Sequence, residues 1–365
     1  MVQGRQAFPE TLISRYPDHL IPESLDPLRS EPMKTYINEI KENENVDSLF
    51  LVREKSLGIT KNGNAYLKLI LVDRSGEMEG RIWTSADLLS GVFEKDDFVQ
   101  VKGKAASFQD HLQLNITHIN RVEEEGILLP DFFPMTEKDI DEMFLTLMET
   151  GQQIKDPYLN QLLSLFWEDK PFVEKFKMAP ASTRLHHTHI GGLLEHTLSV
   201  TQLIMKNAAH YSGLNLDLLI TASILHDLGK VDELSYRRSF DYSDEGRLLG
   251  HIILGMERLE SKIRQLADFP KDLALQLKHL LISHHGQYQW GSPRKPMTLE
   301  AIMLHFLDNL DAKMDGIQQF LKTQVSEGAR FSRYHPYFEQ SFYLPPQKAE
   351  AEPLNIIEEK EIEKE

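Results

Sequence analysis

The stretch LDLLITASILHDLGK, residues 216–230, decides how the C-terminal half of the chain is interpreted. Its first ten residues form an apolar run that predicts a helix, and His226 and Asp227 stand at its end. Gly229 is the residue type that commonly ends helices, so the pair is expected in the last turn. An imidazole nitrogen and a carboxylate oxygen together suit Mn, Fe, Zn or Ni better than Ca. A His-Asp pair alone is nevertheless more often surface decoration or a capped core residue.

Four further helical segments offer potential ligands. His196 lies within GGLLEHTLSV, His251 opens a helix in LLGHI, and His284-His285 close another helix. Asp308 follows an apolar run, where a carboxylate costs several kcal/mol unless it is paired or bound to metal. Taken singly, a core histidine or an Asp308 salt bridge explains each residue as well. Five such segments are difficult to explain as coincidence.

The distribution of histidine and cysteine agrees with this reading. Of 15 histidines, 11 lie between residues 155 and 320, and such clustering directs attention to metal or acid–base chemistry. There are no cysteines, so disulfides, thiol nucleophiles and cysteine zinc sites are excluded. Any metal must be held by His and Asp.

A net charge of −16 over 365 residues would argue against nucleic-acid binding if the charge were spread evenly along the chain. The charge is not spread evenly. The acidic residues are concentrated in 123–154 and at the two ends of the chain, whereas 46–122 holds ten basic and ten acidic residues. No apolar run reaches the ~18–20 residues of a membrane span, and the N-terminus does not resemble a signal peptide. A cytoplasmic protein without membrane contact is expected.

The segment 46–122 has a β pattern. YLKLILV (66–72) runs through a glycine-containing turn into EGRIWT, and FVQVKGKA (98–105) and LQLNITHI (112–119) follow. Short strands at this spacing, with a small helix near 85–93, predict a five-stranded OB-type barrel. An N-terminal extension (1–45) precedes the barrel. An acidic linker (123–154) follows it, with a helix opening at Thr136.

Beyond residue 155 the pattern is helical. We expect helices at 158–167, 190–210, 216–228, 248–267, 271–285 and 298–321. These define an all-α domain over 155–325. A C-terminal segment (326–345) and an acidic, low-complexity tail (346–365) complete the chain.

The motifs HHTHIGGLLEHTLSV, ILHDLGK, LLGHI, LISHHG and LHFLDNLDAKMD resemble the HD superfamily of metal-dependent phosphohydrolases. Behind an OB-like segment, and with SFYLPP at 341–346, they resemble the YhaM-type 3′–5′ exoribonucleases more narrowly. The resemblance covers roughly residues 46–345. It implies an all-α HD domain after the barrel, and hydrolysis of phosphodiester bonds in single-stranded RNA, with single-stranded DNA as a further substrate.

Carried over by position, the resemblance implies a metal centre. Its first ion would be held by His196, His226, Asp227 and Asp308, and its second by His251, His284 and His285. Mn²⁺ is the ion that the family suggests, although Fe, Ni or Co fits the same donors.

Asp227 has a further candidate role, and four other residues of these motifs are candidates as well. Asp227 is a candidate to orient or deprotonate the attacking water, and Lys230 to clamp a phosphate, unless Lys230 merely complements a helix dipole. His187 and His189 are candidates for substrate contact or, equally, for capping. Asp311 lies three residues beyond Asp308 on the same helix face, where it would support a ligand.

The barrel segment also carries candidate nucleic-acid contacts. Alternation in 66–72 sends the leucines inward and places Tyr66 and Lys68 on the outer face; Arg81 and Trp83 share a face of the next strand. One cation and one aromatic ring on each of two strands suit single-stranded nucleic acid. Lys61 and Phe108 would extend this platform. The alternative is that Trp83 or Phe108 belongs to the barrel core.

Two other functions stay open at this point. One is an HD phosphohydrolase acting on nucleotides or cyclic dinucleotides, with the barrel as a regulatory domain. Against the cyclic-dinucleotide version, Gly286 is not followed by the Gly-Tyr-Pro signature of that group. The other is a non-enzymatic nucleic-acid-binding protein acting in DNA replication, which would have no need of seven convergent ligands. A homo-oligomer stays open for an HD exonuclease of this kind.

Overall fold

The computed structural model describes residues 34–60, 62–108, 111–123, 126–183, 185–236, 240–324 and 329–345. The chain divides into two compact units, Met1–Ile127 and Leu128–Glu365, and each is considered by itself. Most of the expected N-terminal extension and the whole acidic tail lie outside the described residues.

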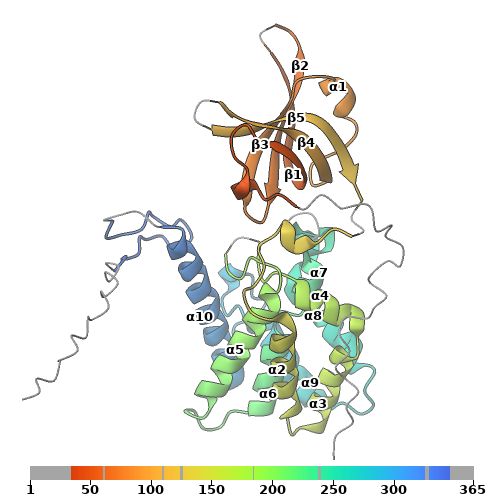
Figure 1. The fold of residues 1–365 in the computed structure, drawn as a ribbon. Coiled ribbons are helices and arrows are strands. Elements are labelled where there is room, and N and C mark those ends of the chain that lie inside the picture. Colours follow the sequence, from red (N-terminus) through yellow and green to blue (C-terminus); the bar gives the residue numbers. More distant parts are fainter. Residues whose placement is uncertain are drawn as a thin grey trace, which may run out of the picture. The chain divides into compact units, whose positions relative to one another are not determined.

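The N-terminal unit is a closed five-stranded barrel (Figure 1). The strands pair in the order β1-β2-β3-β5-β4, and β3 and β5 run parallel while the other neighbours are antiparallel. This confirms the predicted OB-type barrel. The elements are β1 (Asn45–Ile59), β2 (Ala65–Asp73), β3 (Gly76–Ile82), α1 (Ala86–Leu89), β4 (Phe98–Phe108) and β5 (His111–Val122).

Alternation along β2 builds the barrel core. Leu67, Leu69 and Leu71 are fully buried, as predicted, and pack with Phe50 and Val101. Tyr66 and Lys68 therefore point to the outer face. The same strand thus supplies three buried leucines of the core and two residues of the candidate platform.

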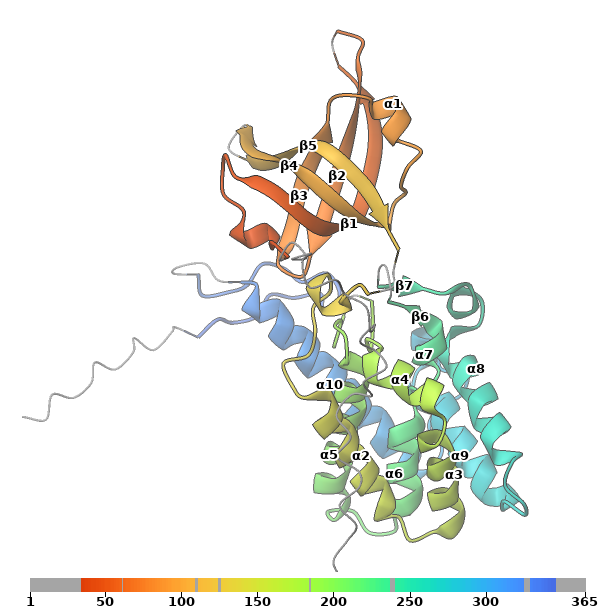
Figure 2. The same ribbon diagram turned by 45° about the vertical axis from the view of Figure 1, so that its right-hand side comes forward.

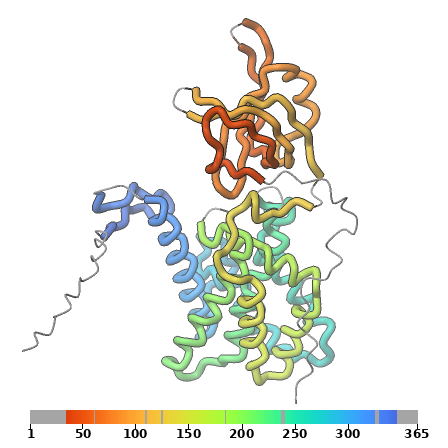
Figure 3. The backbone as a smooth tube through the Cα atoms, viewed as in Figure 1, coloured from red at the N-terminus to blue at the C-terminus, as the bar shows by residue number. Residues whose placement is uncertain are grey.

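The second unit is helical, which confirms the predicted fold class. Helix α5 packs against α2, α4, α6 and α10, and the tube in Figure 3 shows α5 and α10 side by side. Helices α8 and α9 also run together (Figure 2). The helices are α2 (Ile140–Gln152), α3 (Pro157–Trp167), α4 (Lys170–Met178), α5 (Gly192–Ala208), α6 (Leu216–Leu225), α7 (Lys230–Glu233), α8 (Asp244–Ile263), α9 (Lys271–Ser283) and α10 (Leu299–Lys322).

Helix α2 differs from the helix expected in the linker. Asp139, not Thr136, caps its N-terminus, because the Asp139 carboxylate accepts a hydrogen bond from the backbone N–H of Glu142. The Thr136 hydroxyl instead donates to Glu195. Met143, Phe144 and Leu147 are buried in the main helical core, so α2 is part of the helical unit rather than a free connection.

The expected helix end at Gly229 is wrong. Helix α6 ends at Leu225, and Gly229 has a right-handed backbone conformation as the residue that precedes α7. A Cβ at Gly229 would lie 2.0 Å from the carbonyl oxygen of His251, so glycine is required for close packing of α7 on α8. Helix α4 was not predicted, although Asp169 caps it and proline stands in its first turn.

Candidate metal centre

Five histidines converge with two aspartates inside the helical unit. In each histidine, Nδ1 contacts an oxygen that can only accept: a carboxylate of Asp311 for His196, a carboxylate of Glu233 for His251, and backbone carbonyls of Ser223, Leu281 and Trp290 for His226, His284 and His285. Nδ1 therefore carries hydrogen in all five rings, and the neutral ring presents an Nε2 lone pair. This is how proteins orient histidines toward metals.

Asp227 lies between two groups of these rings. Its Oδ2 is 3.3 Å from Nε2 of His226, and its Oδ1 is 3.5 Å from Nε2 of both His251 and His284. Asp308 adds an oxygen 3.2 Å from Nε2 of His196. Figure 1 shows the supporting helices α5, α6, α8 and α10. The seven residues expected as ligands are thus brought together.

Two atoms of this cluster are buried without a hydrogen-bond partner, Oδ1 of Asp227 and Nε2 of His284. Leaving such polar atoms unpaired costs about 1–3 kcal/mol each, more for a charged group. A divalent cation bound between them removes that cost because both atoms are metal donors. The residues therefore fit a metal, and nitrogen with carboxylate donors favours a transition-metal ion.

The electrostatics of the cluster also favour a bound cation. Burial alone would lower the pKa of His196, but Asp308 and Asp311 outweigh it and raise that pKa to about 9. Burial would raise the pKa of Asp308, yet His196 and His226 hold it well below its usual range. On the other side, burial together with neighbouring His284 and His251 lowers the pKa of His285 to about 3, so its ring is neutral at physiological pH.

Lys230 is committed to Asp227. Its Nζ lies 2.6 Å from Oδ2 of that aspartate, and the residue is buried. Lys230 opens the four-residue helix α7 and lies beyond the end of α6 at Leu225, so it is not in the last turn of α6. Burial lowers its pKa, but Asp227 reverses the effect and the pKa is raised, which keeps the ammonium charged.

The residues expected around the ligands separate into two groups. Asp311 accepts a hydrogen bond from Nδ1 of His196 at 2.7 Å and contacts Nε2 of His187 at 3.1 Å. Asp311 therefore supports a proposed ligand directly, and His187 supports it through Asp311. His189 turns away and pairs with Glu195. Asp308 has less apolar cover than its sequence neighbours indicate, because Ile302, Phe306 and Leu310 are exposed on α10.

A cavity of about 710 Å³ opens beside the cluster. Asp227, Asp308, His251 and His285 reach its surface, and so does Lys230. Sequence reasoning missed several of its lining residues, namely His186, Glu233, Trp290, His305, Asn309 and Lys313. The spacing of His305, Asn309 and Lys313 by four positions, one face of a helix that also carries Asp308, is the signal that would have found three of them.

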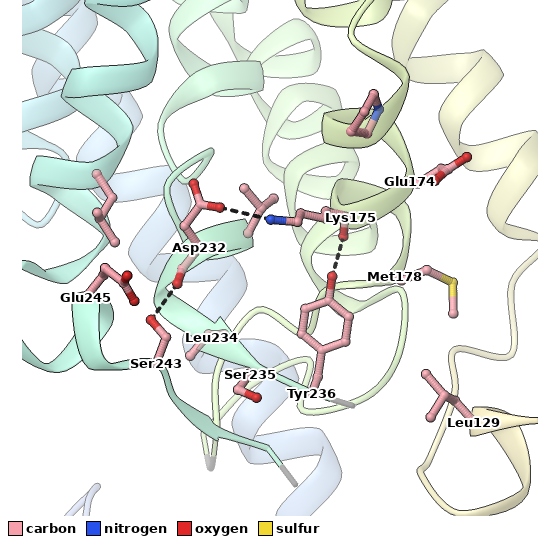
Figure 4. A pocket seen from close by; sticks show the side chains of 13 residues that line it. Leu129, Glu174, Lys175, Met178, Asp232, Leu234, Ser235, Tyr236, Ser243 and Glu245 are labelled. Atoms are coloured by element: carbon pink, nitrogen blue, oxygen red, sulfur yellow. Dashed lines mark hydrogen bonds and ion pairs between the residues drawn. The ribbon is translucent and has the colours of Figure 1, made fainter. Parts of the chain in front are cut away.

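A second cavity, of about 790 Å³, lies beside α4 and α7 (Figure 4). Lys175 lies between Asp232, 3.3 Å away, and Tyr236, whose hydroxyl donates to the Lys175 carbonyl. Lys175 and Asp232 are thus already paired, Asp232 also with Arg258. The convergent ligands line the other cavity.

On the barrel, the candidate platform forms a compact group. The rings of Tyr66 and Trp83 stack with centroids 5.2 Å apart, and the Arg81 guanidinium lies 5.1 Å from the Tyr66 ring. Trp83 is 48% exposed and Phe108 is 56% exposed, so neither belongs to the barrel core. Glu79 lies between the two cations, 2.9 Å from Lys68 and 2.7 Å from Arg81. Lys61 lies outside the described residues.

Among the helices that the structure describes, none has the length and apolar character needed to cross a bilayer.

Comparisons with known proteins agree with this arrangement. Residues 193–313 match the family model described as HD domain. The chain is similar to a 3′-5′ exoribonuclease YhaM from Bacillus subtilis (strain 168), 36% identical over 303 residues, covering 83% of this chain and 95% of the relative. It is also similar to a protein of that name from Geobacillus sp. (strain WCH70), 34% identical over 83% of this chain and 92% of the relative.

Among solved structures, the second OB-fold domain of replication protein A from Methanococcus maripaludis matches 25% of this chain and 96% of its own, with 22% identity and a TM-score of 0.21. The mitochondrial single-stranded DNA binding protein Rim1 of S. cerevisiae matches 23% of this chain and 97% of its own, with 17% identity and a TM-score of 0.20.

Proposed function

This chain belongs to the YhaM family of 3′–5′ exoribonucleases, and on that premise we propose that its helical unit removes nucleotides from the 3′ end of single-stranded RNA. The observation that carries the proposal is the convergence of four ring nitrogens on both carboxylate oxygens of Asp227 and on Asp308, with a fifth, Nε2 of His285, 3.2 Å from that of His251. A nucleic-acid-binding module has no use for such a cluster. Single-stranded DNA is a second proposed substrate, and the cytoplasmic location remains a prediction.

We propose two cation positions that share Asp227. One ion would be held by Asp227 together with His196, His226 and Asp308. The other would be held by Asp227 together with His251, His284 and His285. Mn²⁺ is the proposed ion because the family resemblance suggests it, and Fe, Co or Ni fits the same donors. Bound divalent cations lower the pKa of a water molecule and neutralise charge on the non-bridging phosphate oxygens.

The residues of the chain have separate roles in this proposal. Burial raises the pKa of Asp227, but Lys230 and His226 hold it well below its usual range, so the carboxylate orients the attacking water and is a weak base. Lys230 fixes Asp227 and supplies positive charge at the cavity wall, where the phosphate enters. The water oxygen bonds to phosphorus and the water gives up one proton, the bond from phosphorus to the 3′ oxygen breaks, and that oxygen takes up one proton. A nucleoside 5′-monophosphate leaves.

The barrel platform is proposed to hold the strand. Tyr66 and Trp83 would stack with bases, and Lys68 and Arg81 would contact the backbone, with Lys61 and Phe108 extending the track. The barrel domain is proposed to span 46–122 and the catalytic domain 155–325, with α2 of the intervening segment packed into the core of the helical unit. A homo-oligomer stays a prediction.

The test is incubation of 5′-labelled single-stranded RNA with the protein and Mn²⁺. Stepwise shortening from the 3′ end, abolished by EDTA and by Asp308→Ala, is the expected result. Hydrolysis of nucleotides or cyclic dinucleotides without cleavage of RNA would make the chain a nucleotide phosphohydrolase. Binding of RNA with no cleavage in any divalent metal would contradict an enzymatic function.

A further inference from the structure

A half-exposed tryptophan stands directly beside the ligand cluster. Trp290 is 50% exposed and lines the 710 Å³ cavity. It belongs to the short 3₁₀ helix Tyr288–Trp290, which follows His284 and His285. The Trp290 carbonyl accepts the Nδ1–H of His285 at 2.8 Å, so the residue that presents the ring also orients a proposed ligand. The aromatic surface is therefore tied to the metal centre through one hydrogen bond.

The turn that carries Trp290 is firmly held. Gly286 and Gly291 bracket it in the left-handed conformation, with φ of 74° and 82°. Ser292 is buried, and its hydroxyl contacts the carbonyl oxygens of Ile282 and Arg294. A Cβ at Gly286 would lie 2.3 Å from the His305 ring, so the turn packs directly on α10. A rigid aromatic surface costs little entropy when a flat ligand stacks on it.

One face of α10 continues the wall of the cavity. His305, Asn309 and Lys313, four positions apart, all line it. The Trp290 ring lies 5.9 Å from the His305 ring, and Nζ of Lys313 lies 5.6 Å from the Trp290 ring. Lys313 is exposed and pairs with no carboxylate among the residues that the structure describes. The wall thus combines an aromatic face, an amide and an uncompensated cation.

Residues of the segment 329–345 form another part of the lining. Tyr337, Phe338 and Gln340 reach the cavity, and a backbone hydrogen bond from His335 to Gln340 closes the turn that presents them. The His335 ring packs on Phe320 of α10 with centroids 4.5 Å apart. A second amide and a 58% exposed tyrosine ring therefore line the same cavity.

We propose that this surface is the seat of the 3′-terminal nucleotide, with its base stacked on Trp290 and its 5′ phosphate at the ligand cluster. The inference rests on the proposed function and names the part of the substrate that the cavity recognises. Stacking on an aromatic ring accepts any base, because every base has a π-face. Asn309 and Gln340 offer both donors and acceptors to the base edge or the ribose hydroxyls. Lys313 attracts the polyanion toward the cluster.

The fluorescence of Trp290 tests this seat without relying on catalysis. The chain has three tryptophans, and Trp83, at 48% exposure, matches Trp290 in accessibility but lies in the other unit. Titration of the Mn²⁺-loaded protein with AMP is expected to quench the emission of the wild-type protein and of Trp83→Phe. In Trp290→Phe the quenching should be lost.

Two further variants extend the test to affinity. Isothermal titration with AMP should give binding weaker by about tenfold or more for Trp290→Ala, and a smaller loss for Lys313→Gln. Binding of Mn²⁺ by Trp290→Phe should match the wild type, which shows that the cluster is intact. In the cleavage assay, Trp290→Ala should raise KM for a short RNA more than it lowers kcat.

The outcomes separate the seat from the proposed function. If the protein shortens RNA from the 3′ end but AMP causes no quenching, or the same quenching in Trp290→Phe, the proposed nucleotide site at Trp290 is wrong. The proposed exonuclease activity then still stands. A protein quenched by AMP only through Trp290, yet unable to cut RNA, would support the seat and overturn the exonuclease.

Discussion

Nε2 of His226 lies 3.3 Å from Nε2 of His196, with the hydrogen of each ring already donated from Nδ1. Two ring nitrogens at this distance repel each other unless a proton or a metal ion lies between them. The carboxylates of Asp227 and Asp308 adjoin the same nitrogens and favour such a cation. The pair is therefore the clearest geometric mark of the proposed metal centre.

Addition of Mn²⁺ should stabilise the protein, because the metal binds a site that exists only in the folded chain. At 100 times the dissociation constant the gain is about 2.7 kcal/mol, and EDTA should reverse it. Differential scanning fluorimetry measures the shift in Tm. Asp308→Ala should lose most of it, whereas Asp272→Ala, an exposed residue of α9, should keep it. An equal shift in both variants would count against the assignment of Asp308.

Glu233 should set the affinity of the second cation position. Its Oε1 accepts from both the backbone N–H and the Nδ1 of His251, at 2.9 and 3.0 Å. Glu233→Ala should weaken that position by about 10–100-fold, and Glu233→Gln should recover part of the loss. Calorimetric titration of Mn²⁺ separates the two binding steps. If both positions weakened equally, or if Glu245→Gln had the same effect, Glu233 would not be a specific support.

The stacked pair on the barrel should contribute to the binding of single strands. Tyr66→Ala combined with Trp83→Ala should weaken RNA binding by about 1–3 kcal/mol for each base that loses its stack. Fluorescence anisotropy with labelled RNA and no added metal measures this. Leu88→Ala, which truncates an exposed side chain of α1, is the matched control. Unchanged affinity in the double variant would refute the platform.

Glu79 should restrain the same platform. Its carboxylate pairs with Lys68 and Arg81, and although burial raises its pKa, these two cations lower it below its usual value. A phosphate must compete with this carboxylate. Glu79→Gln should therefore increase RNA affinity several-fold and steepen its dependence on salt concentration. Weaker binding in Glu79→Gln would mean that Glu79 orients the two cations for the strand instead.

Asp169 should give the helical unit a stability that depends on pH. Lys262 of α8 lies 2.8 Å from its carboxylate and lowers its pKa below the usual 3.8. Because the folded-state pKa is depressed, the stabilisation is fully present above the unfolded pKa of about 3.8 and is lost as pH falls from there through the folded-state pKa. Asp169→Asn keeps the cap of α4 but should cost about 1 kcal/mol or less at pH 7.

Urea unfolding followed by circular dichroism at pH 7, 5 and 3 tests this dependence. The difference between Asp169→Asn and the wild type should shrink toward pH 3. A difference that stayed constant over this range would assign the cost to the cap rather than to the ion pair.

The sequence is most informative where a regular apolar pattern fixes which side chains are buried and which polar side chains are left to act. The strand 66–72 alternates so regularly that its buried and exposed faces follow directly. The sequence offers His196, His226 and Asp308 as potential ligands, the resemblance of long motifs groups them around one ion, and the structure brings them together. Pattern alone would not have done so, because these three residues come from α5, the end of α6, and α10, which meet only through packing.

Other features could not be predicted because tertiary contacts decide them. Thr136 has the sequence of a cap, yet the nearby Glu195 takes its hydroxyl. Glu233 belongs to a charged tetrapeptide and looks exposed until His251 approaches it. Trp290 resembles an ordinary loop aromatic, and only the turn closed by Gly286 and Gly291 places it in the cavity.

The backbone at Gly250 interrupts α8, with φ of 75° and ψ of 159°. That break lets the N–H of His251 point at the same Glu233 oxygen that accepts from its ring. The Glu233 carboxylate therefore accepts the first backbone N–H after the break and also orients the ring of a proposed ligand. The start of this part of α8 and the orientation of the His251 ring therefore depend on the same carboxylate. A side chain at position 250 would damage the backbone and the chemistry together.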